Sequence, residues 1–169
     1  PPLPNIQTTV TDPRCFGEAN GSFKITIDSS KAPFSISFNS GKYDTLTQFN
    51  QLKAGSYFVK FTDKFGCNYE RQVKLIQPQK LIVDLGPDST IRLGDKIILT
   101  ASISLSLNEI DSILWSDGSS CQDCILLDAA PLQNSIYAVK VVNNKGCFAT
   151  DSVNIFVDQK LQIDIPNAI

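Results

Sequence analysis

Apolar and polar residues alternate in short runs along most of this 169-residue chain. From Ser22 to Ile27 and from Pro33 to Phe38, Phe and Ile alternate with Lys, Thr and Ser. A period of two is typical of a β-strand with one buried face. The same pattern predicts further strands at Tyr57–Phe61, Arg71–Ile76, Lys96–Ala101, Asp111–Trp115, Tyr137–Val141 and Ser152–Val157. Short strands separated by turn residues such as Asp117-Gly118 are typical of β-sandwiches, so we predict an all-β fold.

The chain contains an internal repeat. Tyr57-Phe-Val-Lys-Phe-Thr-Asp-Lys-Phe-Gly-Cys67 aligns without a gap with Tyr137-Ala-Val-Lys-Val-Val-Asn-Asn-Lys-Gly-Cys147, and the identical positions hold Tyr, Val, Lys, Gly and Cys. A repeat of this kind indicates repeated structural units. In both copies a strand pattern is followed by Asp63 or Asn143 and then by Gly, which suits the turn of a β-hairpin because Gly adopts positive φ at little cost.

The repeat also places a domain boundary. Pro78 has no backbone N–H to donate to a sheet, so it is expected to end the first unit. We predict two tandem Ig-like β-sandwich modules, residues 1–78 and 79–159, joined by a short linker. Modules of this size are large enough to bury a core of their own. Residues 160–169 are expected to form a further linker.

Composition and charge exclude some partners. The chain has 15 Lys and Arg against 17 Asp and Glu, which gives a net charge of -2 with both signs interspersed. Such a pattern provides no basic surface for nucleic acid or for an anionic membrane. No apolar run is long enough to span a membrane, and no signal peptide begins the chain. Because Met is absent, Pro1 is expected to be a processing or cloning boundary.

Catalytic chemistry is not expected. The chain has no His, which removes the commonest general base, the Ser-His-Asp and Cys-His pairs and most catalytic zinc sites. Acidic residues stand singly in the predicted turns at Asp28, Asp44, Asp63 and Asp117, where solvated turn residues are the usual occupants. We therefore predict neither an enzyme nor a cofactor.

One cluster of acidic residues offers an alternative, a calcium site. Asp84, Asp88 and Asp95 surround the Gly86-Pro87 turn and offer oxygen ligands of the kind that calcium prefers. Their spacing matches neither an EF-hand nor an RTX repeat. Calcium is thus an alternative to the prediction of no metal.

The aromatic residues are expected mostly in the core. Trp115 ends a predicted strand just before a turn, where Ig-like sandwiches commonly bury a Trp. Phe16, Phe34 and Phe49 are also expected to be mostly buried. An exposed aromatic platform for glycans is the alternative.

Several motifs of the first unit resemble the SprB-type repeat, which occurs in tandem in very large surface adhesins of gliding Bacteroidetes. The resemblance covers about residues 7–78 and rests on Cys15-Phe-Gly17, Asn20-Gly21-Ser22, Ala32-Pro-Phe34, Phe38-Asn-Ser-Gly41, Phe49-Asn-Gln-Leu-Lys-Ala-Gly-Ser-Tyr57 and Asp63-Lys-Phe-Gly-Cys67.

The rest of the chain resembles parts of the same proteins. The second unit is similar, over about residues 81–158, to the Ig-like or PKD-like module that precedes the C-terminal sorting domain. This similarity rests on Leu85-Gly-Pro-Asp-Ser-Thr-Ile-Arg-Leu-Gly-Asp95, Leu114-Trp115, Ser120-Cys-Gln-Asp-Cys124, Tyr137 and Gly146-Cys147. Ile165-Pro-Asn-Ala-Ile169 resembles the first residues of the gliding-motility-associated, type IX secretion sorting domain, so residues 160–169 would lead into that domain.

This resemblance implies a cell-surface or extracellular protein exported across the outer membrane by type IX secretion. The chain would be a structural or adhesive segment that supports attachment, gliding or cell-cell contact. Its expected partners are neighbouring modules of the same chain and, in a filament or oligomer, further copies; the residues do not specify a glycan or protein target. The alternative is a glycan- or protein-binding accessory module of a secreted enzyme.

Five cysteines in a chain without His fit an oxidising compartment better than a cytosolic metal site. The SprB-type repeat pairs the cysteines that correspond to Cys15 and Cys67, so the resemblance implies a disulfide there. Two buried thiols are the alternative. In the Ig-like module the partner of Cys147 usually lies in the segment 90–94, but Arg92 stands in its place. The resemblance therefore implies a buried free thiol at Cys147.

Cys121 and Cys124 form a Cys-x-x-Cys pair. A thioredoxin-like site needs the first Cys at a helix N-terminus, and the segment that ends at Pro131 is too short for a convincing helix. Structural zinc needs four ligands, and only Cys147 offers a third thiolate. We predict a local disulfide between Cys121 and Cys124, with free thiols or a metal or redox site as alternatives.

Overall fold

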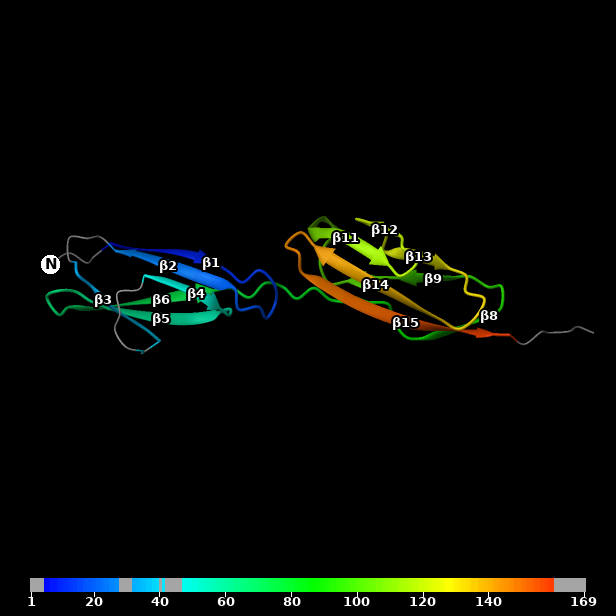
Figure 1. Ribbon diagram of the computed structural model, residues 1–169, viewed down its shortest axis with the longest axis horizontal. Helices are drawn as coiled ribbons and strands as arrows, with labels where there is room; N and C mark the ends of the chain where they lie inside the picture. The colour runs from blue at the N-terminus through cyan, green and yellow to red at the C-terminus, as the bar shows by residue number, and fades with distance from the viewer. Residues whose placement is uncertain (1–4, 28–31, 40, 42–46, 160–169) are drawn as a thin grey trace, which may run out of the picture. The chain divides into compact units, whose positions relative to one another are not determined.

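The computed structural model describes residues 5–27, 32–39, 41 and 47–159. These residues form strands and their connections, with a single 3-10 helix among them (Figure 1). The chain divides into two compact units, Pro1–Lys80 and Leu81–Ile169, so the boundary lies close to the predicted one at Pro78. The predicted fold class, all-β with two sandwich modules, is confirmed.

The first module consists of two antiparallel three-stranded sheets. One has the order β1 (Ile6–Thr11), β2 (Gly21–Ile27) and β4 (Gln48–Leu52), and the other has the order β3 (Ser35–Phe38), β5 (Gly55–Thr62) and β6 (Asn68–Leu75). Alternate residues of both sheets form the core, as a period of two requires. The buried members are Phe23, Ile25, Ile36, Val59, Phe61, Val73 and Leu75.

An aromatic group joins four strands of this module. The ring centroid of Phe23 on β2 lies 4.8 Å from that of Phe49 on β4, and Phe49 stacks on Phe38 of β3 at 4.6 Å. Tyr57 of β5 stacks on Phe38 at 5.6 Å, and its hydroxyl donates a 2.6 Å hydrogen bond to the carbonyl of Lys53. Offset aromatic contacts at these distances stabilise beyond the area that they bury.

The second module contains a larger sheet and two small ones. Its five-stranded sheet has the order β12 (Ser120–Cys121), β11 (Ile110–Trp115), β14 (Ser135–Asn143), β15 (Phe148–Asp158) and β8 (Ser89–Arg92), and β8 alone runs parallel to its neighbour. The small sheets pair β13 (Leu126–Ala129) with β9 (Ile97–Thr100), and β10 (Ser102–Ile103) with β7 (Val83–Asp84). The 3-10 helix η2 (Leu107–Glu109) precedes β11.

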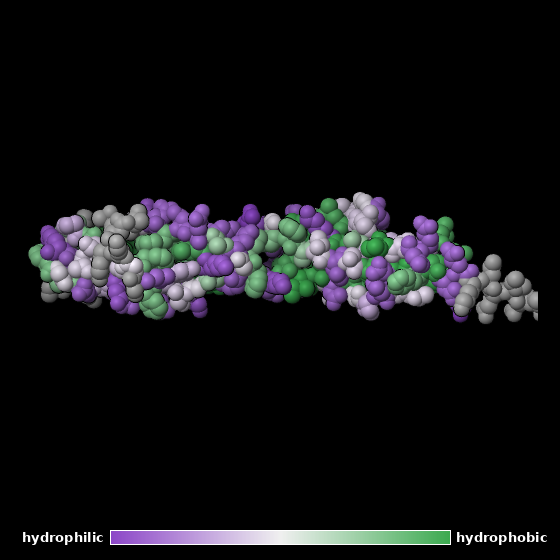
Figure 2. Space-filling view, turned by 60° about the horizontal axis from the view of Figure 1, so that its bottom comes forward, coloured by the Kyte–Doolittle hydropathy of each residue, from purple (hydrophilic) through white to green (hydrophobic). Residues whose placement is uncertain are grey.

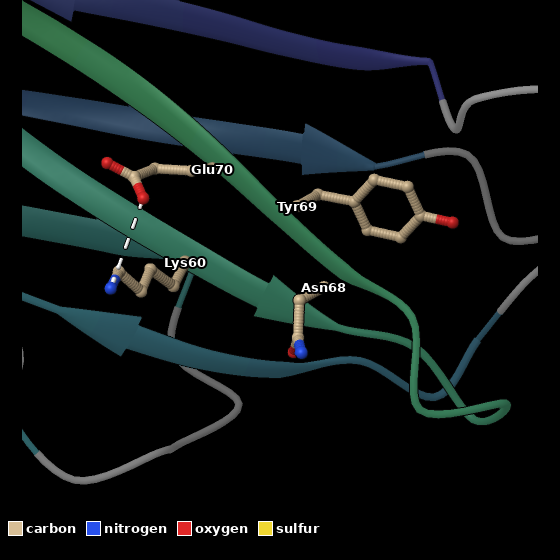
Figure 3. Close-up of a pocket in the computed structure, with 4 residues that line it drawn as sticks. All are labelled: Lys60, Asn68, Tyr69 and Glu70. Atoms are coloured by element: carbon tan, nitrogen blue, oxygen red, sulfur yellow. Dashed lines mark ion pairs between the residues drawn. The ribbon is translucent and has the colours of Figure 1, made fainter.

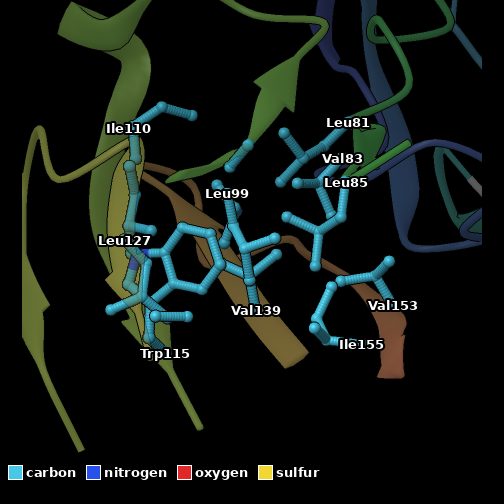
Figure 4. Packing of buried hydrophobic residues seen from close by; sticks show 14 residues of the cluster. Leu81, Val83, Leu85, Leu99, Ile110, Trp115, Leu127, Val139, Val153 and Ile155 are labelled. Carbon is cyan, nitrogen blue, oxygen red and sulfur yellow. The ribbon is translucent and has the colours of Figure 1, made fainter. Parts of the chain in front are cut away.

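Trp115 lies in the core of the second module, as predicted. Only 4% of its surface is exposed, and it packs among aliphatic side chains from the facing strands (Figure 4). Its indole Nε1 donates a 2.8 Å hydrogen bond to the carbonyl of Cys124. A buried indole needs such a partner, because an unpaired polar group in the core is costly.

The internal repeat corresponds to a repeated β-hairpin. Tyr57 pairs with Val73 across β5 and β6, and Tyr137 pairs with Val153 across β14 and β15, so the two hairpins have the same register. Register decides which side chains face the core. The residues that repeat in the sequence therefore occupy equivalent positions in the two modules.

Candidate functional site

The turn between β5 and β6 is built around the side chain of Asp63. Its Oδ1 accepts hydrogen bonds from the backbone N–H groups of Phe65 and Cys67, both at 2.9 Å. The N–H of Gly66, at φ +82°, donates to the carbonyl of Asp63 at 2.9 Å. Asp63 is only 5% exposed, so the prediction of a solvated turn residue is wrong. The carboxylate is buried because it accepts the turn's own N–H groups.

The turn between β14 and β15 repeats this arrangement with a different residue at its base. Oδ1 of Asn143 accepts from the N–H groups of Lys145 and Cys147 at 3.0 and 2.9 Å, and Gly146 has φ +78°. Asn143 is 8% exposed. An amide oxygen and a carboxylate oxygen therefore perform the same function, and Cys67 and Cys147 occupy equivalent positions in the two turns.

Cys67 carries a free thiol and is exposed, so the predicted Cys15–Cys67 disulfide is not formed. The connection that contains Cys15 lies at the Leu75 end of β6, because the N–H of Ile76 donates to Oδ1 of Asp12 at 2.7 Å. Cys67 precedes the opposite end of this 8-residue strand. Eight residues of strand span roughly 25 Å, and a disulfide needs Cα atoms within about 7 Å. Cys15 is disulfide-bonded, but not to Cys67.

Cys147 is disulfide-bonded and half-buried, so the prediction of a buried free thiol at this position is also wrong. The residue stands in the turn directly before β15 and not at a core-facing position of a strand.

The structure contains the predicted disulfide between Cys121 and Cys124, with the two Cα atoms 5.6 Å apart. It closes the loop between β12 and β13 directly beside the indole of Trp115, whose hydrogen bond to the Cys124 carbonyl anchors that loop. Strand β13 follows, where a thioredoxin-like site requires a helix. The disulfide thus secures a loop over the core.

Two of the three aspartates of the calcium alternative, Asp84 and Asp88, bind groups of their own module through their carboxylates. Oδ1 of Asp84 accepts from the N–H of Gly86 at 2.8 Å. Asp88 accepts from both the N–H and the Nδ2 of Asn154, at 2.8 and 3.0 Å. Asp95 donates its N–H to the carbonyl of Arg92. Within the described residues, no three His, Cys, Asp or Glu side chains are grouped as metal ligands.

Asp117 occupies an exposed turn, as predicted. Its Oδ1 accepts from the hydroxyl of Ser119 at 2.6 Å and from the Ser119 N–H at 2.8 Å. The hydroxyl hydrogen bond, followed by the backbone one, lowers the pKa of Asp117 below its ordinary 3.8. Asp28 and Asp44 lie outside the described residues, as do the expected linker 160–169 and the Ile165–Ile169 motif.

An open pocket of about 310 Å³ lies on the β5–β6 hairpin and is lined by Lys60, Asn68, Tyr69 and Glu70 (Figure 3). Lys60 and Glu70 are paired across the two strands, with Nζ 4.0 Å from Oε2 and about half of each side chain exposed. Exposed ion pairs of this kind contribute little to stability.

The three phenylalanines of the glycan alternative are not brought together on one face. Phe34 and Phe49 pack against the core of the first module, as predicted. Phe16 is 52% exposed and lies under Nζ of Lys80, so the prediction of a mostly buried residue is wrong at that position.

Other apolar side chains are exposed on the outer face of the five-stranded sheet. They include Leu114, Ile136 and Phe148, and Nζ of Lys140 lies 4.9 Å from the centre of the Phe148 ring. On the face of each module seen in Figure 2, exposed apolar residues lie among polar ones. No helix in the described part of the chain is long and apolar enough to cross a membrane.

No protein-family model matches the sequence, and no curated protein matches it. The solved structures described next share little sequence identity with this chain. Domains 4 and 5 of the S-layer protein SbsC have a TM-score of 0.39 and 8% identity, covering 90% of this chain and 97% of that one. A marsupial T cell receptor has a TM-score of 0.42 and 9% identity, covering 97% and 75%.

The protein SGBP-B of the Bacteroides ovatus mixed-linkage glucan utilization locus, solved with a mixed-linkage heptasaccharide, has a TM-score of 0.28 and 14% identity. The match covers 88% of this chain and 47% of that one, so the chain spans about half the length of SGBP-B. Similarity at this level carries no conclusion about function.

Proposed function

We propose that this chain is a non-catalytic structural segment of a bacterial cell-surface or extracellular protein, in which tandem β-modules support attachment, gliding or cell-cell contact. The observation that carries the proposal is the repeated hairpin. Both modules use the same register and the same turn, down to the hydrogen bonds of Asp63 and Asn143. Repeated modules of this kind build extended proteins by addition of units.

The cysteines support an extracellular location. Cys15, Cys121, Cys124 and Cys147 are disulfide-bonded. Disulfides persist in oxidising compartments and are rare in the cytosol. The disulfide beside Trp115 adds a covalent link at the point where the loop covers the core.

The polar side chains support a non-catalytic role, because they stabilise turns and strands. Asp63, Asn143, Asp88 and Asp117 are each occupied by hydrogen bonds within their own module. A catalytic carboxylate instead directs its oxygens at a substrate. We assign export to the type IX system on the resemblance of the sequence motifs.

Immunogold electron microscopy of the cells that make the protein tests this proposal. Antibodies raised against residues 1–169 are applied to intact cells, with permeabilised cells and an antibody against a cytosolic protein as controls. Label on the outer surface or on appendages of intact cells is the expected result. Label that appears only after permeabilisation would contradict the proposal.

A binding role is the second candidate, and it is carried by Phe148, which is 65% exposed beside Lys140. An aromatic ring on an open sheet face is a suitable surface for stacking a sugar ring. A glycan array probed with residues 1–169 and with Phe148→Ala tests it. Saturable binding that is lost in the variant would favour this candidate over a purely structural role.

A further inference from the structure

Cys67 is the one cysteine of the chain without a disulfide. The sequence has five cysteines, and all five belong to the described residues. Four of them are disulfide-bonded, and Cys67 is free and exposed. An unpaired, accessible thiol in a protein of an oxidising compartment indicates either a reactive group or a bond to another partner.

The second module provides an independent observation about this position. Cys147 is the repeat equivalent of Cys67, and the N–H of each donates at 2.9 Å to the side-chain oxygen at the base of the same turn. Cys147 is disulfide-bonded. The equivalent position of the sister module is therefore one at which the fold forms a disulfide.

No cysteine within residues 1–169 is available to Cys67. Cys121 and Cys124 are bonded to each other, and Cys15 and Cys147 are already oxidised. The full length of β6 also separates Cys67 from the connection that carries Cys15. A partner thiol for Cys67 would therefore come from outside residues 1–169.

The surroundings of Cys67 suit a contact with another module. Phe65, two residues earlier in the same turn, is 73% exposed. Nζ of Lys64 lies 5.1 Å from the centre of that ring. The turn thus presents an exposed aromatic ring and a cation beside the thiol.

We propose that Cys67 forms a disulfide with a cysteine of a neighbouring module of the same protein, outside residues 1–169. The inference rests on the proposed function, because repeat modules present equivalent surfaces to successive neighbours. The disulfide that Cys147 of the second module forms would then have a counterpart in a disulfide of Cys67 in the first module.

The bond forms by thiol–disulfide exchange. The Cys67 thiolate attacks one sulfur of an oxidant disulfide, such as the active-site disulfide of an extracytoplasmic oxidoreductase, and expels the other sulfur as a thiolate. The partner cysteine's thiolate then attacks Cys67 Sγ in this mixed disulfide and expels the second thiolate of the oxidant. Two protein thiols lose two protons and two electrons, and the oxidant disulfide is reduced to a dithiol.

Mass spectrometry of the native protein tests the proposal. The producing cells are treated with N-ethylmaleimide before lysis, and the full-length protein is digested without reductant. We expect the Cys67 peptide to be joined to a cysteine peptide from outside residues 1–169, and to be released by reduction. A Cys67 peptide that carries N-ethylmaleimide overturns the proposal, as does one joined to Cys67 of a second copy or to another cysteine of residues 1–169.

Thiol titration of the unreduced, recombinant chain provides a matched control. Residues 1–169 should show a single reactive thiol per chain, and Cys67→Ser should show none. Cys147→Ser, which frees the partner of that residue, should gain a thiol. The disulfide proposal and the proposed function can fail separately. Gold label on the surface of intact cells together with an alkylated Cys67 overturns the disulfide proposal alone. Label that appears only in permeabilised cells overturns the proposed function.

Discussion

Two different side chains, Asp63 and Asn143, form the base of equivalent turns in the two modules. Each is nearly buried, and each uses one oxygen to accept two backbone N–H groups. Oδ2 of Asp63 also accepts a 3.2 Å hydrogen bond from the hydroxyl of Tyr69. The shared oxygen, and not the charge, is therefore what the turn requires.

Two substitutions of Asp63 distinguish the effect of the side-chain oxygen from the effect of the negative charge. Asp63→Ala removes the acceptor of two N–H groups and should destabilise the first module by about 1–3 kcal/mol. Asp63→Asn keeps the oxygen, as Asn143 does, and should cost less. Hydrogen exchange of peptides from β5 and β6 in the full chain measures the difference. Equal loss of protection in both variants would show that the charge is the essential property.

Trp115 combines packing with a hydrogen bond. Trp115→Phe leaves a cavity and an unpaired Cys124 carbonyl, so the second module should lose roughly 2 kcal/mol. Urea unfolding followed by far-UV circular dichroism measures the loss. Leu114→Ala, on the exposed face of the same strand, is the control and should have a small effect. An unchanged midpoint for Trp115→Phe would contradict the packing described for the core.

Asp117 provides a test of pH dependence. Its pKa is lowered chiefly by the hydroxyl of Ser119, so the fold favours the ionised carboxylate. This contribution to stability is present above the unfolded-state pKa and is lost as the pH falls through the lower, folded-state pKa. An NMR titration should give a pKa below 3.8 that rises in Ser119→Ala. The same pKa in both proteins would show that the hydroxyl has no influence.

At the residue scale, the sequence predicted some disulfides and buried residues correctly and others wrongly. The Cys121–Cys124 disulfide and the buried Trp115 follow from local spacing and from the end of an apolar strand. Asp63 and Phe16 were predicted wrongly. Asp63 is buried where it accepts the N–H groups of its own turn, and Phe16 is exposed beside Lys80, which is distant in sequence. Cys15, Cys67 and Cys147 show that a disulfide needs three-dimensional proximity, which spacing does not provide.

At the scale of single elements, close packing of the strands limits which residues they accept. Gly21 opens β2 and is buried. A Cβ atom there would lie 2.6 Å from Cδ2 of Leu75 and 2.9 Å from the carbonyl of Leu52. The two sheets of the first module thus approach each other at a position where only Gly fits.

Gly21→Ala should therefore destabilise the first module by about 1–3 kcal/mol, because the added methyl group overpacks the contact with Leu75. Thr26→Ala, on the exposed face of the same strand, is the matched control and should have little effect. Differential scanning calorimetry of the full chain measures both variants. Equal melting profiles for wild type and Gly21→Ala would contradict this close approach.

The sequence predicted the strands in which apolar and polar residues clearly alternate, and it missed others. The patterns at Ser22–Ile27 and Asp111–Trp115 correspond to β2 and β11. By contrast β1, with the sequence Ile-Gln-Thr-Thr-Val-Thr, lies at the edge of its sheet and is mostly exposed, so it lacks the buried residues that create the pattern. Two-residue strands such as β7 and β12 are too short for any periodicity.

At the scale of the whole molecule, the internal repeat was the most informative sequence feature. It located two modules and a boundary close to the observed division between Lys80 and Leu81. A repeat preserves the residues that every copy needs, here Tyr, Val, Gly and Cys of the hairpin. The proposed function as a structural segment requires each of these modules to resist unfolding as a separate unit.

Single-molecule force spectroscopy of the reduced chain tests that claim most directly. The modules extend from Ile6 to Leu75 and from Val83 to Asp158. At roughly 3.5 Å per residue, each should release on the order of 250 Å of chain. We predict two separate unfolding events of this size in every complete trace. A single event that releases both modules together, or extension without any force peak, would contradict the account.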